Sequence, residues 1–596
     1  MSDEKNEIPE ITPQVIHLID LLKRAKEGRL RVPRFQREFI WRRQDIVDLF
    51  DSIARQYPIG TLFLWGAQPI PSSRPHIGPL RLPDYSGETW LVLDGQQRLT
   101  TLVGVLLAGE PQCSTEGDDD PQRWSLFFDA KTNSFSHAAK EALLPSHFVP
   151  VPALLDTVKL YDQLEKMMRT VSPDQDPGAP SREVVFQWIG RAQEVARAIQ
   201  SYRIPLVEIK TNNLSIAVES FSRLNKKGRS IGQDEMFSAL TYEEGDAGAF
   251  HLAPEIDTLQ QDMIRSGFGE VDRVILLRAV LIAAGEDMYR TDWTSLGDAV
   301  KEKVRTQLPQ GVVQAGKGLA HARAFLRDLG VLNARMLPYS MQLVALSAFY
   351  GRCENPNSAQ LTLLRRWFWV SSFGGWFGAR NPAIVLKLVE ELRDDTSKDI
   401  NPIGFKYMDI EQAALPPPLR FDLRSARVRA MLCVLLARKP QRPDGTELGL
   451  DEAARLLFER GPESMRRLCA TVHDGNLRKS PANRVLDVAQ EVRGQAKNWM
   501  VKLAPAIRDR VLESHAIRAD FFSLLESGNN DGFLQQRVAF LAEIEREFME
   551  KVHVTPPVSN IPAPSAYDSD DIECFDDLDD IELLEGPDMD ALDLWS

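Results

Sequence analysis

In the N-terminal half, the chain reads Trp90-Leu91-Val92-Leu93-Asp94-Gly95-Gln96-Gln97-Arg98-Leu99-Thr100-Thr101-Leu102. The apolar run 90–93 predicts a short buried strand, and the apolar spacing after it predicts a helix over about 99–108. Between them lies the polar stretch 94–98, in which Gly95 permits a tight bend. The sequence therefore predicts a strand, a turn and a helix in direct succession.

The predicted bend carries the groups that an anionic ligand needs. The first turn of a helix presents unpaired N–H groups and a partial positive charge. Gln96 and Gln97 donate and accept hydrogen bonds, and Arg98 offers a bidentate fork for phosphate. Asp94 has three alternative roles: holding a metal ion, orienting Arg98 or capping the helix. The plainer interpretation is an Asp-Gly turn without a ligand.

Periodicity predicts the surrounding elements. The expected helices span about 16–25, 43–55 and 215–224, and the expected strands span 30–35, 61–65, 124–129 and 204–209. From about 233 to 550 the pattern is mostly helical. The expected fold class is α+β: an N-terminal small mixed sheet with helices, followed by a large mainly α-helical region and a disordered acidic tail.

A chain of 596 residues exceeds the roughly 250–300 residues over which a single core keeps growing. We expect a first domain over 1–240 that handles nucleotide or DNA, a helical domain over 241–400 and a C-terminal helical domain over 401–554. Residues 555–596 are expected to form a Pro-rich linker and an acidic tail.

The acidic tail carries nearly all of the net charge of −14. Residues 567–596 contain 13 Asp or Glu and no Lys or Arg, which leaves 85 − 13 = 72 acids against 71 bases elsewhere. Apolar residues recur every third position within it, at Ile572, Phe575, Leu578, Ile581 and Leu584. Three interpretations remain open: a disordered solubilising tail, a docking segment for a partner, or a DNA mimic that covers a basic face of this protein.

Several protein classes are not expected. No apolar run approaches the ~20 residues that span a bilayer, and no signal peptide is evident, so we expect a cytoplasmic protein without membrane association. The five cysteines form no CxxC pair, so we expect neither zinc nor haem. Trp367, Trp369 and Trp376 are expected in a core rather than stacked on bases.

Three segments resemble motifs of one protein family. In chain order they are Val32-Pro33-Arg34-Phe35-Gln36-Arg37-Glu38-Phe39-Ile40-Trp41, Leu93-Asp94-Gly95-Gln96-Gln97-Arg98-Leu99-Thr100-Thr101-Leu102 and Phe221-Ser222-Arg223-Leu224-Asn225-Lys226-Lys227-Gly228. They resemble the N-terminal domain of GmrSD-type restriction endonucleases, a ParB/sulfiredoxin-like domain with a DGQQR motif. The aromatic run 366–373 also resembles the helical region that often follows this domain.

The resemblance implies binding of a nucleoside triphosphate with Mg²⁺, its hydrolysis, and action on phage or modified DNA in a prokaryotic restriction or anti-phage defence system. It implies a set of catalytic residues and a set of phosphate-binding residues, and Arg98 belongs to both. The catalytic residues would be Asp94, Gln96, Gln97 and Arg98, with Asp94 as a possible Mg²⁺ ligand. The phosphate-binding residues would be Gln36, Arg37, Gly95, Arg98 and Asn225.

Many relatives carry a His-Asn-His nuclease domain, and its elements are not evident here. The nearest fragment is His473-Asp474-Gly475-Asn476-Leu477, and no histidine occurs between His321 and His473 to supply the upstream base. A partner nuclease would then cut the DNA, or the N-terminal domain would nick it. A further alternative is a non-catalytic sensor of nucleotide or modified DNA. Enzymatic activity, the identity of the NTP and the oligomeric state stay open.

Arginines are dense around the first motif, at Arg29, Arg31, Arg34, Arg37, Arg42 and Arg43. One interpretation is a phosphate-binding face, and the other is an ordinary solvated surface.

Overall fold

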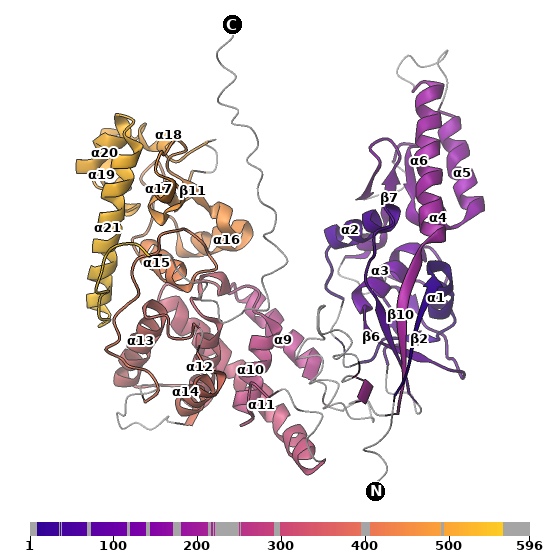
Figure 1. The fold of residues 1–596 in the computed structure, drawn as a ribbon, viewed down its shortest axis with the longest axis horizontal. Helices are drawn as coiled ribbons and strands as arrows, with labels where there is room; N and C mark the ends of the chain where they lie inside the picture. The colour runs from indigo at the N-terminus through magenta and orange to yellow at the C-terminus, as the bar shows by residue number, and fades with distance from the viewer. Residues whose placement is uncertain are drawn as a thin grey trace. The chain divides into compact units, whose positions relative to one another are not determined.

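The computed structural model describes residues 9–563 except 35, 37–38, 68–72, 116–119, 139–143, 171–179, 213–215, 218–219, 221–249, 251, 291–297, 379, 395–405 and 490–493. Contacts divide the chain into two compact units. Unit 1 comprises residues 1–257 and 292–298, and unit 2 comprises residues 258–291 and 299–596. Figure 1 shows the elements of both, and each is described by itself below.

Unit 1 is an α+β unit. Its elements are β1 (Glu10–His17), α1 (Leu18–Lys26), β2 (Leu30–Arg31), α2 (Arg43–Ala54), β3 (Leu62–Gly66), β4 (His76–Ile77), β5 (Leu80–Arg81), β6 (Trp90–Asp94), α3 (Gln96–Leu106), β7 (Leu126–Asp129), β8 (Ser134–His137), β9 (Phe148–Pro150), α4 (Val151–Leu155), α5 (Thr157–Met168), α6 (Arg182–Ser201) and β10 (Arg203–Lys210).

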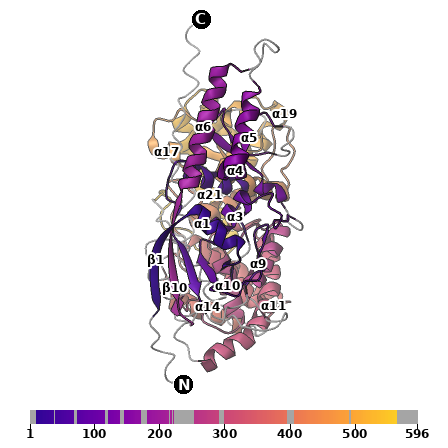
Figure 2. The ribbon, with the colours of Figure 1, turned by 90° about the vertical axis from the view of Figure 1, so that its right-hand side faces the viewer.

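The main sheet of unit 1 has the strand order β1-β10-β3-β6-β2. β10 pairs parallel with β3 and β2 pairs parallel with β6, whereas β1–β10 and β3–β6 are antiparallel, so the sheet is mixed. Figure 2 shows β1 and β10 side by side at one edge. β6 lies between β3 and β2, so the strand that leads into the predicted bend starts inside the sheet.

Helices cover one face of this sheet and build the core of unit 1. Leu62, Leu64 and Val92 of the sheet pack in one buried cluster with the apolar residues of α1, α2, α3, α4 and α6. α2 shows how the sequence produces this packing, because its apolar positions repeat every three to four residues. The Asp45 carboxylate accepts a hydrogen bond from the N–H of Arg42 at 2.7 Å, and this bond caps the start of α2.

A second, three-stranded sheet of order β8-β7-β9 leads into the α5–α6 helical hairpin. In Figures 1 and 2, α5 and α6 run side by side away from the main sheet. Asp156 and Ser181 cap the first turns of these two helices with their side-chain oxygens.

Unit 2 is mainly helical. Its elements, of which α9 and α11 begin in unit 1, are α9 (Leu252–Arg265), α10 (Arg273–Ala283), α11 (Asp298–Asp328), α12 (Ser340–Tyr350), α13 (Ser358–Phe373), α14 (Pro382–Asp394), α15 (Ala426–Leu436), α16 (Leu450–Arg460), β11 (Met465–Arg467), α17 (Gly475–Lys479), β12 (Arg484–Leu486), α18 (Lys497–Met500), α19 (Pro505–Ser514), α20 (Ala519–Glu526) and α21 (Asn530–Lys551).

The core of unit 2 forms around α12, whose apolar residues are buried on every side. The three tryptophans Trp367, Trp369 and Trp376 are each at most 1% exposed, which confirms that they belong to a core. A buried ion pair joins α15 to α21, with two N–H groups of Arg427 bonded to the two carboxylate oxygens of Glu545 at 2.6 and 2.8 Å.

The expected fold class is confirmed: a small mixed sheet with helices precedes a large helical region. The proposed tail beyond residue 563 and the expected helix at 215–224 lie outside the described residues. The proposed domain boundaries at 240, 400 and 554 stay a prediction. Among the residues that the structure describes, no helix has the length and apolarity needed to cross a membrane.

Candidate functional site

The junction of β6 and α3 has the predicted strand, bend and helix. Gly95 has a φ of +87°, in the left-handed region, and stands at the N-cap of α3. A Cβ there would lie 2.2 Å from Cδ2 of Leu62, so a side chain is excluded on two counts. The helix begins at Gln96 rather than near Leu99, because the bend is completed within one residue. Gln96, Gln97 and Arg98 therefore form the first helical turn.

Arg98 turns back over the bend that it follows. Its guanidinium donates to Oδ2 of Asp94 at 2.9 Å and to the carbonyl of Ile59 at 2.7 Å. A Cβ on Gly60 would lie 2.4 Å from Nη1 of Arg98, and Gly60 also has a left-handed φ of +85°. Of the three roles considered for Asp94, the geometry shows orientation of Arg98, and the N-cap position belongs to Gly95.

The two glutamines of the first and second motifs join the segment around residues 36–40 to this junction. Nε2 of Gln36 donates to the carbonyls of Val92 and Leu93 at 2.6 and 2.8 Å. Oε1 of Gln97 accepts a hydrogen bond from the N–H of Ile40 at 2.9 Å. The structure thus brings the first and second motifs into direct contact.

Arg74 also holds the backbone of Gln36, and one polar atom of the Gln36 side chain has no partner among the described residues. Arg74 donates to the carbonyl of Gln36 at 2.5 Å, and the N–H of Arg74 donates to the carbonyl of Val32 at 2.8 Å. The Gln36 side chain is 4% exposed, and its Oε1 has no hydrogen-bond partner among the described residues. Buried polar atoms almost always have partners, so this oxygen marks a place where a further group would fit.

Two of the predicted site residues, Arg37 and Asn225, lie outside the described residues. Their proximity to the junction stays a prediction. Gln96 is among the described residues, and it is buried in the first turn of α3.

Ile59 and Gly60 also belong to the junction, although no sequence motif includes them. A glycine that follows a helix by several residues instead of directly was the available signal, since it indicates a position where a Cβ would collide.

The described groups at this junction include an open helix start and one carboxylate. The N-terminus of α3 has no side-chain cap, and its first turn follows a glycine. Asp94 is the carboxylate at the bend, and it already pairs with Arg98. Within the described ranges, no group of three or more His, Cys, Asp or Glu side chains is arranged to hold a metal.

Three of the arginines near the first motif bind three different partners. Arg29 pairs with Glu27, Arg31 donates to the carbonyl of Pro83, and Arg43 pairs with Asp120. The hydrogen bond that Arg43 donates to the carboxylate of Asp120 raises the pKa of Arg43 and lowers the pKa of Asp120. These three side chains support the interpretation as an ordinary surface.

The fragment around His473 forms an exposed turn before α17. The side-chain oxygens of Asp531 accept hydrogen bonds from the N–H groups of His473 and Asp474 at 3.3 and 2.9 Å, and Asp474 caps α17. These backbone hydrogen bonds lower the pKa of Asp531. The arrangement is that of a capped loop.

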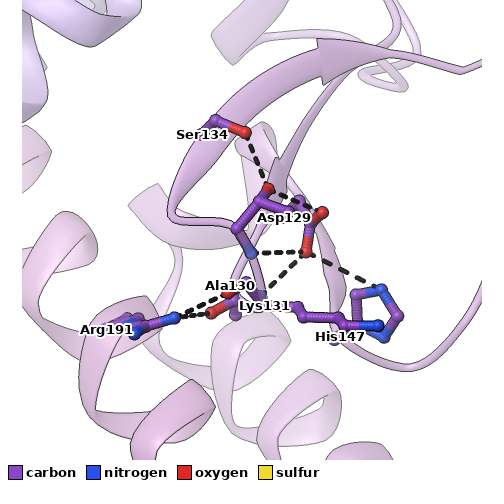
Figure 3. A network of polar contacts seen from close by, with 7 residues as sticks. Asp129, Ala130, Lys131, Ser134, His147 and Arg191 are labelled. Atoms are coloured by element: carbon purple, nitrogen blue, oxygen red, sulfur yellow. Dashed lines mark hydrogen bonds and ion pairs between the residues drawn. The ribbon is translucent and has the colours of Figure 1, made fainter. Parts of the chain in front are cut away.

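A second polar cluster, shown in Figure 3, lies at the turn between β7 and β8. Oδ2 of Asp129 accepts from the hydroxyl of Thr132 at 2.7 Å, and that hydroxyl lies 2.8 Å from the hydroxyl of Ser134. Oδ1 of Asp129 lies 3.7 Å from Nε2 of His147. Burial lowers the pKa of His147, although the charge of this carboxylate acts to raise it. The hydroxyls face the carboxylate and not the imidazole, so the cluster fixes a turn rather than activating a nucleophile.

Arg191 of α6 completes this cluster from the helical hairpin. Its Nη1 donates to the carbonyls of Ala130 and Lys131 at 3.0 and 2.7 Å, as Figure 3 shows. The contact ties α6 to the small sheet.

Comparison with known proteins places the junction inside a family domain. Residues 18–242 match the family described as "GmrSD restriction endonuclease, N-terminal domain". An uncharacterized protein of Methanocaldococcus jannaschii is 24% identical over 433 residues, which cover 64% of this chain and 68% of that protein. The family match includes both motifs that the structure places together.

Proposed function

Since residues 18–242 form a domain of the GmrSD restriction endonuclease N-terminal family, we propose that this chain binds a nucleoside triphosphate at the β6–α3 junction and hydrolyses it in DNA-directed defence. The DNA of a phage or a modified DNA is the proposed target, and the cytoplasm is the proposed compartment. A partner nuclease is proposed to cut the DNA.

The observation that supports this proposal is the bend at Gly95. It precedes α3, a helix without a side-chain cap, which contacts the segment of the first motif. N–H groups at such a helix start favour a phosphate, and the left-handed Gly95 lets the backbone approach it. Arg98 donates two hydrogen bonds among the described residues. A guanidinium has five N–H groups, so three are left for phosphate oxygens.

The remaining roles follow from position. Oε1 of Gln36 would accept a hydrogen bond from the ligand or from an attacking water, because this buried oxygen has no partner in the described part of the chain. Gln97 keeps the segment around Ile40 in place. Asp94 would hold Arg98 in orientation, and a Mg²⁺ carried by the nucleotide would take most of its ligands from phosphate and water. Such an ion would neutralise charge on the phosphates.

A second candidate is a sensor that binds without turnover. It is favoured by the fact that the amide groups of Gln36 and Gln97 already bond to backbone groups, which leaves few side chains to activate water. In that case binding of the nucleotide would change the segment around residues 36–40 and recruit an effector.

The test measures binding and phosphate release for each NTP with Mg²⁺. We expect saturable binding of one NTP, turnover, and loss of turnover by at least about 100-fold in Arg98→Ala, the range for removing one charge-stabilising donor. Arg169→Ala, at an exposed arginine directly after α5, is the matched control and should behave as the wild type. A melting curve for each variant separates lost chemistry from lost folding.

The outcomes discriminate among the candidates. Binding without phosphate release supports the sensor. Nicking of supercoiled plasmid by the wild-type chain alone supports a nuclease. Absence of binding for every NTP at millimolar concentration, in a chain that melts cooperatively, would overturn the proposed function.

A further inference from the structure

Two arginines face each other across the small β11–β12 sheet of unit 2. Arg467 of β11 stands directly opposite Arg484 of β12. Like charges in such a cross-strand pair repel and destabilise the sheet. Burial and the charge of Arg467 together lower the pKa of Arg484 to about 10.

More positive charge gathers at the same place. The guanidinium of Arg484 lies 5.3 Å from the ring centroid of Phe421, and the N–H of Phe421 donates to the carbonyl of Lys479 at 2.8 Å. Arg420 precedes Phe421 in the chain, and Arg478 precedes Lys479. We call these five basic residues the basic cluster: Arg420, Arg467, Arg478, Lys479 and Arg484.

The neighbouring carboxylates have other partners. Asp422 pairs with Arg424, and Asp474 caps α17. Among the described residues, Arg420, Arg478, Lys479 and Arg484 make no ion pair, and Nε of Arg484 is buried without a hydrogen-bond partner. Arg420, Arg478 and Lys479 are exposed. The cluster is therefore an accessible positive surface beside an aromatic ring.

The end of the described chain is anchored beside this surface. The N–H of Ala563 donates to the carbonyl of Pro417 at 3.1 Å, and the N–H of Leu419 donates to the carbonyl of Ala563 at 3.0 Å. Leu419 directly precedes Arg420 of the basic cluster. The chain that continues past Ala563 thus begins next to the cluster.

We propose that the acidic tail, residues 567–596, docks on the basic cluster of unit 2. The tail carries 13 carboxylates and no Lys or Arg. Its first carboxylate, Asp568, follows Ala563 by five residues, and an extended chain of that length reaches about 17 Å. A short flexible tether gives an effective concentration in the millimolar range, so modest charge attraction suffices.

Charge and apolar spacing both favour the tail over other occupants. Carboxylates would bond to the guanidinium groups, and the apolar residues at every third position, such as Phe575, would lie on the exposed part of Phe421. The contact would weaken with salt, because exposed charges are screened beyond about 8 Å at physiological ionic strength. The inference does not depend on the proposed nucleotide site.

The test uses the full chain and the native thiol of Cys574 in the tail. Lys479→Cys places a second thiol in the basic cluster, and Lys387→Cys places one at an equally exposed position of α14 as the control. After mild oxidation and proteolysis, mass spectrometry measures the yield of each disulfide with Cys574. We expect at least a tenfold higher yield for Lys479→Cys, and loss of this preference at 1 M salt.

Charge reversal provides the second arm. In the Lys479→Cys chain, Arg420→Glu with Arg478→Glu should lower the yield at least tenfold, whereas Lys387→Glu with Arg546→Glu should leave it unchanged. Equal yields at 479 and 387, or a yield that ignores the reversal at 420 and 478, would overturn the proposal. If the full chain instead binds an oligonucleotide through these arginines while the two yields are equal, the cluster is a nucleic-acid surface and the tail is not its occupant.

Discussion

At the scale of single residues, Arg98 explains two glycines. It lies over Gly95 and against Gly60, and both glycines have left-handed φ angles and no room for a Cβ. The consequence is a junction in which two chain segments, 59–60 and 94–98, meet through one guanidinium, which is bonded to Asp94 and Ile59. A ligand at α3 would meet a site that is organised before it arrives.

The cost of a side chain at Gly95 is testable. In Gly95→Ala, left-handed strain costs about 1–2 kcal/mol and overpacking against Leu62 costs about 1–3 kcal/mol more. Gly109→Ala is the matched control, because Gly109 has nearly the same φ of +85° but no atom within 4 Å of the added Cβ. Urea unfolding should show a larger loss of unfolding free energy for Gly95→Ala than for Gly109→Ala. Equal losses in the two variants would mean that the contact with Leu62 does not affect stability.

The sequence grouped these residues but did not predict their hydrogen-bond partners. It identified Gln36, Gln97 and Arg98 as a group, and the structure joins the segments that carry them. It did not predict that the Gln36 amide bonds to the carbonyls of Val92 and Leu93, or that Arg98 reaches Ile59. Such partners depend on how loops cross in space, and a motif does not contain that information.

At the scale of elements, the buried strands and the helix α2 were predicted closely, since each has a complete apolar pattern. The edge strand β1 was missed, because its residues are mostly exposed and show no burial period. The prediction of a strand over 30–35 was too long. Only Leu30 and Arg31 pair with β6, and the next residues, Val32 and Pro33, pair with Arg74 and Ser73 instead.

The link between α6 and the β7–β8 turn makes a prediction at this scale. Arg191→Ala removes two hydrogen bonds from a charged donor, each worth about 1.5–3 kcal/mol when buried and less here because the site is partly exposed. Hydrogen exchange should quicken at the amides of residues 130–137. Arg197→Ala, on the same helix but bonded only within it, should leave those amides unchanged. Faster exchange in both variants would indicate general loosening of α6.

At the scale of the whole molecule, contacts separate two units, and each has a buried core of its own. The length of the chain predicts more than one domain, and the proposed boundaries at 240, 400 and 554 stay a prediction.

Two units predict two unfolding transitions in calorimetry. Glu545→Gln removes the charge that balances the buried Arg427, which costs about 3–5 kcal/mol, and should lower only one of the two transitions. Gly95→Ala should lower only the other. A single transition that moves with both substitutions would show that the units unfold together.

The contact between Gly60 and Arg98 has a consequence for how this domain changes over evolutionary time. An alanine at position 60 collides with the guanidinium, whereas a shorter side chain at position 98 removes that obstacle. The two positions, 38 residues apart in the chain, are therefore expected to be substituted as a pair among descendants. A lineage that loses the arginine would remove this collision, so that only the left-handed φ of +85° would still favour glycine at position 60, whereas the opposite order would meet both obstacles at once.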